Sequence, residues 1–299
     1  MDRPRILHFL TPLANLSPFD VNMAYDAGFA VAGYTKVDPQ DVVALTQDAM
    51  FSRAPQDAAK TVLFIGGRDA MAALDMAEAA RQAMFPPFQI STFADPSGAF
   101  TTAAAMVALA EKHLVAQGGR LDGAKVAIFG AKGVVGGVVG IIAAEAGAQV
   151  TLVGYDHTDV VPQKASAFER RFGKRFAAAD GSSDEGRRRA LADCGVALVA
   201  AKAGLQVLSR RDLEAAAHLK VAADVNAVSP AGIEGVAAKA NGAPLDIGEG
   251  AVGIGALAIG DIKFRLQRQL LQRLHDTEKA AHIDFRDAYQ AARAMVGVG

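Results

Sequence analysis

Strand-like and helix-like segments alternate along almost the whole chain, and this alternation restricts the fold more than any other feature of the sequence. Short apolar runs rich in Val, Ile, Leu and Ala end at Gly, Pro or Asp and give way to segments with helical periodicity. The predicted strands are residues 5–10, 29–35, 61–67, 88–95, 125–130, 149–155, 196–201 and 220–225. Strands separated by helices form right-handed βαβ crossovers and a parallel sheet. The sequence therefore predicts an α/β fold.

Two α/β domains are expected from the length and from a break in the pattern. The chain has 299 residues, 51% of them hydrophobic, which suits about two domains of ~150 residues each. A glycine-rich stretch at 118–123 separates the two series of strands. Long helices are predicted at 102–117, within 253–276 and at 284–295. We expect a first domain of residues 1–117 and 266–299, in which the C-terminal helices pack back on the first series of strands, and a second of residues 118–265.

Charge and composition argue against several classes of protein. Lys and Arg total 31 against 32 Asp and Glu, so no basic stripe is available for nucleic acid. Cys194 is the single cysteine, and the histidines are scattered without an HExxH pattern, so we expect neither a disulfide nor a metal centre. No apolar run approaches the ~18 residues of a membrane span, and the first residues lack a signal-peptide core. A cytoplasmic protein is expected.

The segment VAIFGAKGVVGG (126–137) places a glycine-rich turn between a predicted strand and a predicted helix. Gly133 and Gly136 match the second and third glycines of the G-x-G-x-x-G fingerprint, whereas Ala131 stands at the first position and Gly130 lies one residue earlier. Such glycines allow a tight turn, close approach of a diphosphate and close helix–strand packing, and the helix N-terminus attracts the phosphates. The turn predicts a dinucleotide site; the alternative is an ordinary turn in a domain that binds no nucleotide.

An acidic residue at the fingerprint distance indicates the kind of nucleotide. Asp156 lies twenty residues after Gly136, at the end of the next predicted strand. A carboxylate there accepts hydrogen bonds from the ribose hydroxyls and repels a 2′-phosphate, which favours NAD, although His157 and Lys164 leave NADP open. Residues after two further strands are expected to line the cofactor, because ligands bind at the carboxyl ends of parallel strands. The expected cofactor-binding residues are Gly130, Ala131, Lys132, Gly133, Val134, Val135, Asp156, Ala201 and Asn226.

Longer motifs carry a resemblance to a known family. They are SPFDVNMAYDAG (17–28), DVVALTQDAMFSRAPQD (41–57), FADPSGAFTTAAAMVA (93–108), DVNAVSPAGI (224–233), AVGIGALAIGDIK (251–263) and DFRDAY (284–289). In these stretches the chain resembles the NAD(P)-dependent methylene-tetrahydromethanopterin dehydrogenases of methylotrophic bacteria, which are related to the methylene-tetrahydrofolate dehydrogenases. The motifs occur in order over nearly the whole chain, so the resemblance outweighs the glycine turn as evidence.

The resemblance implies an oxidoreductase of one-carbon metabolism, acting in formaldehyde oxidation. Its second domain would be a Rossmann-like NAD(P)-binding sheet facing the first domain across a cleft, within a homo-oligomer (a trimer or hexamer). The implied reaction moves a hydride from methylene-tetrahydromethanopterin to NAD(P)⁺ and leaves the methenyl cation. The rival interpretations are a methylene-tetrahydrofolate dehydrogenase and a protein that senses NAD(P) without turnover.

The chemistry of that reaction needs few side chains. The donor carbon lies between two nitrogens, so loss of hydride gives a resonance-stabilised cation and no general base is required. A carboxylate near the developing charge would help, and the motifs offer Asp20 and Asp95 as catalytic candidates. The alternatives are that Asp20 only complements a helix dipole and that Asp95 only forms a turn.

The other substrate-site candidates lie in the same motifs. Lys263 is a catalytic candidate with an orienting role toward the substrate, or else a surface lysine. The expected substrate-binding residues are Phe19, Ser97, Thr101 and Thr102. The alternative for the two threonines is that they cap the helix that they open.

Overall fold

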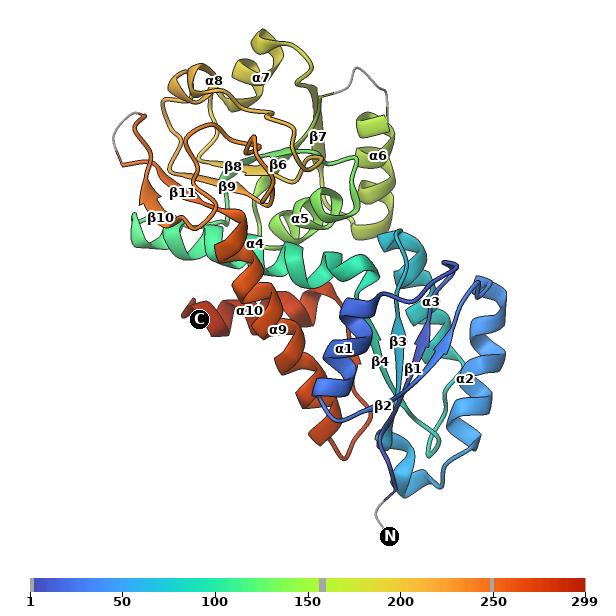
Figure 1. The fold of residues 1–299 in the computed structure, drawn as a ribbon. Helices are drawn as coiled ribbons and strands as arrows, with labels where there is room; N and C mark the ends of the chain where they lie inside the picture. The colour runs from blue at the N-terminus through green and yellow to red at the C-terminus, as the bar shows by residue number, and fades with distance from the viewer. Residues whose placement is uncertain (1–2, 156–159, 248–249, 299) are drawn as a thin grey trace. The chain divides into compact units, whose positions relative to one another are not determined.

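The protein forms two compact α/β units, each with its own sheet (Figure 1). The structure is a computed structural model, and it describes residues 3–155, 160–247 and 250–298. Unit 1 comprises residues 1–101 and 264–288, and unit 2 comprises 102–263 and 289–299. The predicted α/β fold class is confirmed, because both sheets are built from parallel strands joined by helices.

The sheet of unit 1 has the strand order β12-β4-β3-β1-β2. The central strand β1 (Ile6–Leu10) pairs in parallel with β2 (Ala30–Tyr34) on one side and β3 (Thr61–Ile65) on the other. Strand β4 (Ser91–Ala94) pairs with β3, and the two-residue β12 (His282–Ile283) pairs with β4. The chain order changes direction between β1 and β3, which makes the carboxyl ends of these strands the switch point of the sheet.

The sheet of unit 2 has the order β10-β11-β9-β8-β5-β6-β7. Its strands are β5 (Lys125–Phe129), β6 (Gln149–Gly154), β7 (Phe176–Asp180), β8 (Val196–Val199), β9 (Val221–Asp224), β10 (Asn241–Pro244) and β11 (Val252–Ile254). Only the β10–β11 pair is antiparallel within the described part of this sheet. The switch point lies between β5 and β8, because β6 and β7 extend one way from β5 and β8 and β9 the other.

Helices connect the strands and pack on the sheets. Those of the first strand series are α1 (Pro18–Asp26), α2 (Val42–Phe51), α3 (Ala70–Gln82) and α4 (Ala99–Ala116). They are followed by α5 (Val134–Glu145), α6 (Val160–Phe172), α7 (Asp184–Leu191), α8 (Arg210–Glu214), α9 (Ala256–Asp276) and α10 (Phe285–Val296). Short 3₁₀ turns occupy Pro39–Asp41, Pro55–Lys60 and Pro96–Gly98.

The boundary between the units lies inside helices. It divides α4 at Thr101 and also falls within α9 and α10, so one continuous helix belongs to both units in each case. The stretch at 118–123, where we expected the domains to meet, follows the end of α4. The assignment of a substrate role to residues 1–117 and 266–299 and of a cofactor role to 118–265 stays a prediction.

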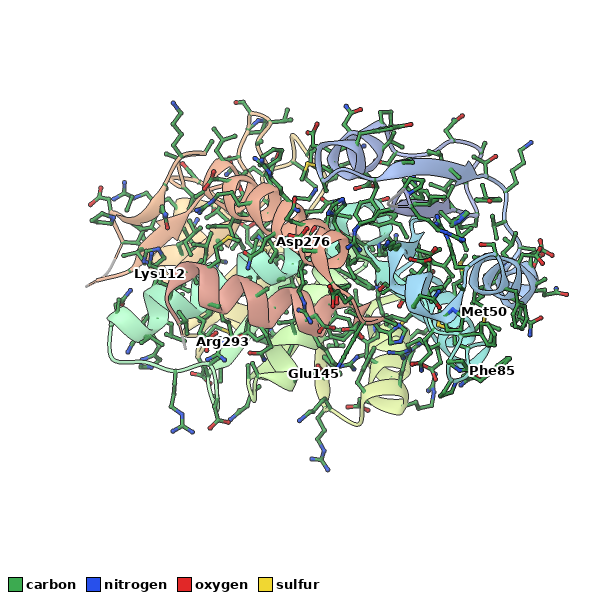
Figure 2. The ribbon with its side chains drawn as sticks, turned by 90° about the horizontal axis from the view of Figure 1, so that it is seen from below. Met50, Phe85, Lys112, Glu145, Asp276 and Arg293 are labelled. Carbon is green, nitrogen blue, oxygen red and sulfur yellow. The ribbon has the colours of Figure 1, made fainter. Side chains whose placement is uncertain are left out.

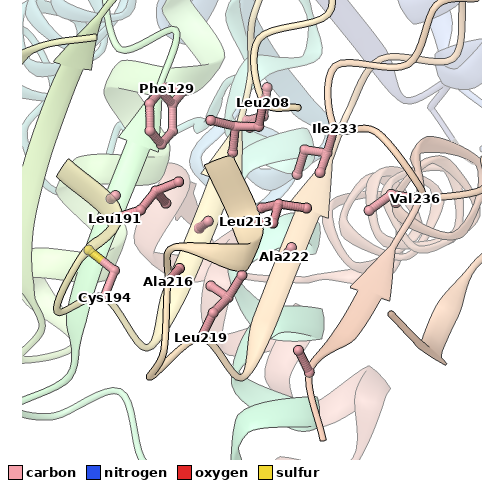
Figure 3. Close-up of a cluster of buried hydrophobic side chains, with 14 of the residues drawn as sticks. Phe129, Leu191, Cys194, Leu208, Leu213, Ala216, Leu219, Ala222, Ile233 and Val236 are labelled. Carbon is pink, nitrogen blue, oxygen red and sulfur yellow. The ribbon is translucent and has the colours of Figure 1, made fainter. Parts of the chain in front are cut away.

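One cluster of buried apolar side chains in unit 2 includes residues of α7 and α8 and of the strands on which they pack (Figure 3). Phe129 from β5, Leu191 from α7 and Leu213 from α8 are buried together there. Cys194 lies in this cluster, as expected of a small apolar residue, and burial raises the pKa of its thiol to about 11. A thiol with that pKa is a poor nucleophile at neutral pH. Cys194 is therefore a packing residue of this cluster.

A buried polar cluster fixes the last helix within unit 2. Glu111 on α4 accepts hydrogen bonds from Tyr289 Oη at 2.7 Å and from Arg293 Nε at 2.8 Å; Arg293 is labelled in Figure 2. Burial and the adjacent carboxylate raise the pKa of Tyr289, so its hydroxyl stays a donor.

In the described part of the chain, no helix is both long and apolar enough to cross a membrane, and no three His, Cys, Asp or Glu side chains gather as metal ligands.

Candidate functional site

The glycine turn lies at the carboxyl end of β5, beside the switch point of the unit 2 sheet. Gly130 follows β5, and Ala200 follows β8, the neighbouring strand on the other side of the switch. Ala200 N donates to Phe129 O at 2.8 Å, which extends the ladder into the two turns. Open parallel sheets bind their ligands at this kind of place, outside the strand ends where the chain order reverses.

Gly130 is required by both its conformation and its surroundings. Its φ of +84° lies in the left-handed region that favours glycine. A Cβ atom on Gly130 would lie 2.4 Å from Ala200 O and 2.8 Å from Ala201 N, both of them backbone atoms. Because backbone atoms at the end of a buried sheet cannot move aside cheaply, only glycine fits. The structure thus places Gly130 and Ala201 side by side, and their expected contacts with the cofactor stay predictions.

Gly136 is required by the packing of the first turn of α5. A Cβ atom there would lie 2.4 Å from Gly130 O, so the helix could not approach the end of β5 so closely. This is the helix–strand contact that the third glycine of the fingerprint provides. Gly133 is the N-cap of α5, with φ −68° and ψ 164°, and its N–H donates to Gly130 O at 3.0 Å.

The N-terminus of α5 is suited to an anion. The first N–H groups of a helix have no partner within it, and they carry its positive dipole end. Here they belong to Val134, Val135 and Gly136, and the glycine N-cap has no side chain that would accept from them. The turn that Gly130 and Gly136 create therefore presents N–H donors to a diphosphate. These residues fit a dinucleotide.

The Asn226 side chain connects the loops that follow β8 and β9 through three hydrogen bonds. Its Oδ1 accepts from Gly204 N at 3.2 Å and from Val228 N at 2.9 Å, and its Nδ2 donates to Pro230 O at 2.9 Å. The side chain is 5% exposed and joins the loops that follow β8 and β9. Its expected contact with the cofactor stays a prediction, since these hydrogen bonds give it a structural task.

Asp224 is a buried carboxylate that the sequence analysis did not single out. It ends β9, and its oxygens accept from the backbone N–H groups of Asn226, Gly232 and Ile233 at 2.9, 2.7 and 3.3 Å. Burial raises the pKa of Asp224, although these three donors favour its charged form. A charged residue at the end of an apolar strand, with Asn two residues further on, was the available signal. Its task is to shape the loop after β9.

Two lysines lie at the turn. Lys132 lies exposed in the turn itself, and Lys164 on α6 reaches the turn with its ammonium group. Lys164 was considered only as a group near a 2′-phosphate, and its contact with the loop could not be predicted from sequence. Asp156, the expected ribose ligand, lies outside the described residues.

In unit 1 the candidate residues also follow strand ends. Asp95 comes directly after β4 and is fully buried. Its Oδ1 accepts from Phe100 N at 2.8 Å and Thr101 N at 3.2 Å, and its Oδ2 accepts from Thr101 Oγ1 at 2.7 Å. Asp95 therefore caps the N-terminus of α4, and Thr101 belongs to the same cap. The turn expected as the alternative for Asp95 is present, because Gly98 N donates to Asp95 O at 3.1 Å, and Thr101 supports the cap by donating to the carboxylate.

Ser97 joins two strand ends of unit 1. It adopts the left-handed conformation with φ 53°, which is uncommon for a residue other than glycine, and its hydroxyl donates to Gly67 O at 2.7 Å. Gly67 follows β3, so Ser97 ties the loop after β4 to the loop after β3. A strained residue at the edge where ligands bind is consistent with a functional turn.

Asp20 lies in the first turn of α1, directly after the loop that leaves β1. It is 5% exposed, and its Oδ1 accepts from the buried Gln267 Nε2 at 2.6 Å. Ser17 caps the helix by accepting from Asp20 N at 3.3 Å, as the Ser-Pro pair predicted. Phe19 is 44% exposed and lies edge-on to Phe264, with 6.4 Å between the ring centroids.

The remaining candidates belong to unit 2. Thr102 on α4 and Lys263 on α9 are both half-buried. The structure therefore brings Phe19, Asp20, Asp95, Ser97 and Thr101 to strand ends of unit 1, and the predicted cofactor residues of 130–135 together with Ala201 to one edge of unit 2. None of the substrate or catalytic roles is tested by this placement.

Comparison with known proteins extends the resemblance to the whole chain. A family model described as "Methylene-tetrahydromethanopterin dehydrogenase, N-terminal" matches residues 18–97, which include Asp20 and Asp95. The chain is 49% identical over 294 residues, covering 98% of it and 99% of the relative, to the NAD(P)-dependent methylenetetrahydromethanopterin dehydrogenase of Methylorubrum extorquens. It is 31% identical over 94% of its length, and 96% of the relative, to the bifunctional protein MdtA of the same organism.

Solved structures resemble the fold at low sequence identity. Quinate dehydrogenase from Corynebacterium glutamicum, solved in complex with NAD, gives a TM-score of 0.52 at 15% identity, covering 97% of this chain and 99% of that one. Ornithine carbamoyltransferase from Pyrococcus furiosus gives a TM-score of 0.53 at 11% identity, covering 90% and 83%. These likenesses support the fold alone. The near-complete match at 49% identity decides the family: the chain belongs to the NAD(P)-dependent methylenetetrahydromethanopterin dehydrogenases.

Proposed function

We propose that this protein oxidises methylene-tetrahydromethanopterin to methenyl-tetrahydromethanopterin by direct hydride transfer to NAD(P)⁺ in one-carbon metabolism. The observation that carries the proposal is the 49% identity over 98% of the chain with a relative that bears this activity in its name. The glycine turn supports it independently, because Gly130 and Gly136 allow the tight turn and the close helix–strand packing that a dinucleotide-binding βα unit needs.

Unit 2 would hold the nucleotide. The N–H groups of Val134 and Val135 at the start of α5 would bind the diphosphate, with Gly130 and Gly136 allowing it to approach. Ala201 would line the nucleotide from the end of β8. Bound NAD(P)⁺ supplies the hydride acceptor. The protein's own contribution is then to fix the nucleotide in one position and to exclude water.

Unit 1 would supply charge and position for the pterin. Asp20, which accepts a hydrogen bond from the amide of Gln267, would stabilise the positive charge that develops as hydride leaves. Asp95 would act as a positioning residue, because its carboxylate already binds the N-terminus of α4 and thereby orients that helix. No proton moves in this reaction, so neither aspartate is needed as a base.

The remaining candidates would contact the substrate. Phe19 presents an exposed ring that suits the flat pterin, and Ser97 and Thr101 lie in the turn that opens α4. Thr102 would contribute a hydroxyl, and Lys263 would orient the substrate. These four roles and that of Lys263 come from the resemblance and are offered for test.

The reaction is tested by offering both methylene-pterins with both nucleotides and recording reduced nicotinamide. Methylene-tetrahydromethanopterin should be oxidised, and the tetrahydrofolate derivative should react poorly. Activity with the folate derivative alone would favour a methylene-tetrahydrofolate dehydrogenase, and tight nucleotide binding without any turnover would favour a sensor. For the side chains, we expect Asp20→Asn and Lys263→Met to lower kcat at unchanged thermal stability, and equal activity would remove that residue from the site.

Nucleotide preference, assembly and location are further parts of the proposal. The Asp156 carboxylate would favour NAD⁺ over NADP⁺, so the ratio of kcat/KM for the two nucleotides should shift toward NADP⁺ in Asp156→Ser. A homo-oligomer, a trimer or hexamer, and a cytoplasmic location are proposed from the family resemblance. Light scattering of the purified protein tests the assembly, and a monomer at micromolar concentration would contradict it.

A further inference from the structure

The turn contains one glycine more than the fingerprint needs. Gly137 is a buried residue in the first turn of α5 and lies outside the G-x-G-x-x-G spacing. A Cβ atom on it would lie 3.0 Å from Lys164 Nζ, 3.1 Å from Lys164 Cε and 3.2 Å from Phe168 Cζ. The missing side chain thus leaves a path along α5 for the lysine. The Lys164 side chain therefore explains why position 137 is a glycine.

Lys164 uses this path to reach the backbone of the turn. It lies on α6, and its Nζ donates to Lys132 O at 2.9 Å and to Gly133 O at 3.2 Å. Phe168, one turn further along α6 and 2% exposed, lies below the ammonium with 5.5 Å from Nζ to its ring centroid. The Lys164 ammonium therefore lies between the ring of Phe168 and two carbonyl oxygens of the 130–134 turn.

Both carbonyls belong to the peptide units that carry the loop's N–H groups. In a trans peptide the C=O and the following N–H point in opposite directions within one plane. The unit with Lys132 O carries Gly133 N–H, and the unit with Gly133 O carries Val134 N–H. Fixing the two oxygens from α6 therefore fixes the directions of the two N–H groups on the other side of the loop.

The two N–H groups have different tasks. Gly133 N–H donates to Gly130 O at 3.0 Å and closes the turn. Val134 N–H is the first of α5, where no earlier turn can accept from it, so it points out of the helix N-terminus. A cation on the carbonyl side of a peptide unit also polarises its N–H, which becomes a stronger donor to an anion.

We propose that Lys164 is a positioning residue for the nucleotide diphosphate, acting through the backbone of the 130–134 turn over the gap that Gly137 leaves. The proposal rests on the proposed function, since it presumes that the turn binds NAD(P). It goes beyond that function because it assigns the affinity for the diphosphate partly to a side chain on α6 that contacts the loop from behind. The alternative is that Lys164 only fastens α6 to the domain.

Calorimetric titration of the whole protein with NAD⁺, ADP-ribose and adenosine distinguishes a role of Lys164 in diphosphate binding from a purely structural role. Lys164→Met keeps the chain length and removes the donors and the charge. Its Kd for NAD⁺ and ADP-ribose should rise on the order of 10-fold, because the N–H groups of the turn lose their fixed direction. Adenosine, which has no diphosphate, should bind within about twofold of wild type. Lys164→Arg should restore most of the affinity. In turnover, KM for NAD⁺ should rise while kcat stays near wild type.

Gly137→Ala gives a second, independent approach that leaves the lysine in place. Its methyl group should displace the ammonium and weaken ADP-ribose binding, and in Lys164→Met the same substitution should add nothing. Gly140→Ala is the matched control, because its Cβ would meet Leu152 in the core at 2.9 Å and not Lys164. It should lower stability without this coupling to position 164.

The failures are distinguishable. Wild-type protein that binds neither NAD⁺ nor ADP-ribose would overturn the proposed function itself. Wild-type binding with unchanged ADP-ribose affinity in both Lys164→Met and Gly137→Ala would overturn the role of Lys164 alone. Equal weakening of ADP-ribose and adenosine in Lys164→Met would show that the lysine only supports the fold.

Discussion

Two turns in this molecule connect a buried parallel strand to a following helix, and they treat the helix N-terminus in opposite ways. In unit 1 the turn after β4 carries Asp95, whose carboxylate accepts two N–H groups and one hydroxyl at the start of α4. In unit 2 the turn after β5 carries Gly133, which has no side chain to accept anything from α5. The first N-terminus is closed by the protein's own anion, and the second is open to one from outside.

The difference shows that the same strand–turn–helix arrangement can either stabilise a helix N-terminus or leave its N–H donors exposed. A carboxylate at a helix N-terminus contributes about 0.5–2 kcal/mol of stability, and the glycine turn forgoes this. The four glycines at 130–137 also add conformational entropy to the unfolded chain. Unit 2 gives up stability at the place where it needs exposed donors, whereas unit 1 uses the same position to fix α4. The following predictions break or sharpen this contrast.

The largest effect is expected from closing the open turn sterically. In Gly130→Ala the new Cβ would lie 2.4 Å from Ala200 O, so the turn must move and affinity for NAD⁺ should fall by more than about 100-fold. The free energy of unfolding should fall by about 2–4 kcal/mol. Gly118→Ala is the control, because its φ of +71° is similar but nothing lies within 4 Å. It should cost only about 1–2 kcal/mol and leave the Kd unchanged.

Removing the internal anion should mainly affect stability. Asp95→Ala leaves two buried N–H groups and the Thr101 hydroxyl without their acceptor, so the free energy of unfolding should fall by about 3 kcal/mol. Asp95→Asn keeps one acceptor and should lose roughly half of that. Urea unfolding followed by circular dichroism measures both, and calorimetry should find NAD⁺ affinity within twofold of wild type (about 0.4 kcal/mol). A loss of NAD⁺ affinity as large as that of Gly130→Ala would contradict the contrast.

The closed design can be transferred to the open turn. Gly133 has the extended N-cap conformation, so Gly133→Asp should cap α5 as Asp95 caps α4 and raise the melting temperature slightly. The new carboxylate would occupy the place of a phosphate and repel it, so the Kd for NAD⁺ should rise about 10- to 30-fold. Gly133→Ser caps without charge and should weaken binding less. Equal affinity in all three proteins would mean that the nucleotide does not use this N-terminus.

The smallest effect is the dependence of stability on pH, to which two histidines of unit 1 contribute. Burial and Arg53 lower the pKa of His8, and burial and Arg81 lower the pKa of His282, both in unit 1. The unfolded chain therefore takes up protons below pH ~6.5 that the folded unit refuses until lower pH, so stability should fall as pH falls through this window. The double variant His8→Gln, His282→Gln should flatten the dependence of the melting temperature on pH between 6.5 and 5. An unchanged slope would assign it to other groups.

Much of the fold could be predicted from sequence because the strands are apolar and the helix starts are marked. The runs at 61–67 and 125–130 correspond to β3 and β5, and the Ser17-Pro18 pair does cap α1. Strand β7 was missed because its sequence, Phe-Ala-Ala-Ala-Asp, has no β-branched residue. The two-residue β12 was missed because a strand so short exists only through its pairing with β4.

The candidate site was predicted less completely, and the reason is distance along the chain. Gly130, Gly133 and Gly136 follow from one local pattern, and the tertiary structure agrees with it. The capping by Asp95 adds a task that its motif alone could not distinguish from catalysis. The contact of Asp20 with Gln267 joins residues 247 positions apart, which no local pattern contains.

The sequence by itself thus determined the α/β class, the family and the position of the glycine turn, because periodicity, motif order and glycine spacing are local properties of the chain. Only the tertiary structure decided why the turn needs glycine at positions 130 and 137. It did so by bringing Ala200 against Gly130 from the next strand and Lys164 across Gly137 from the next helix. Those contacts depend on how βαβ crossovers place distant segments side by side, and the number of atoms that fit between them is a property of packing.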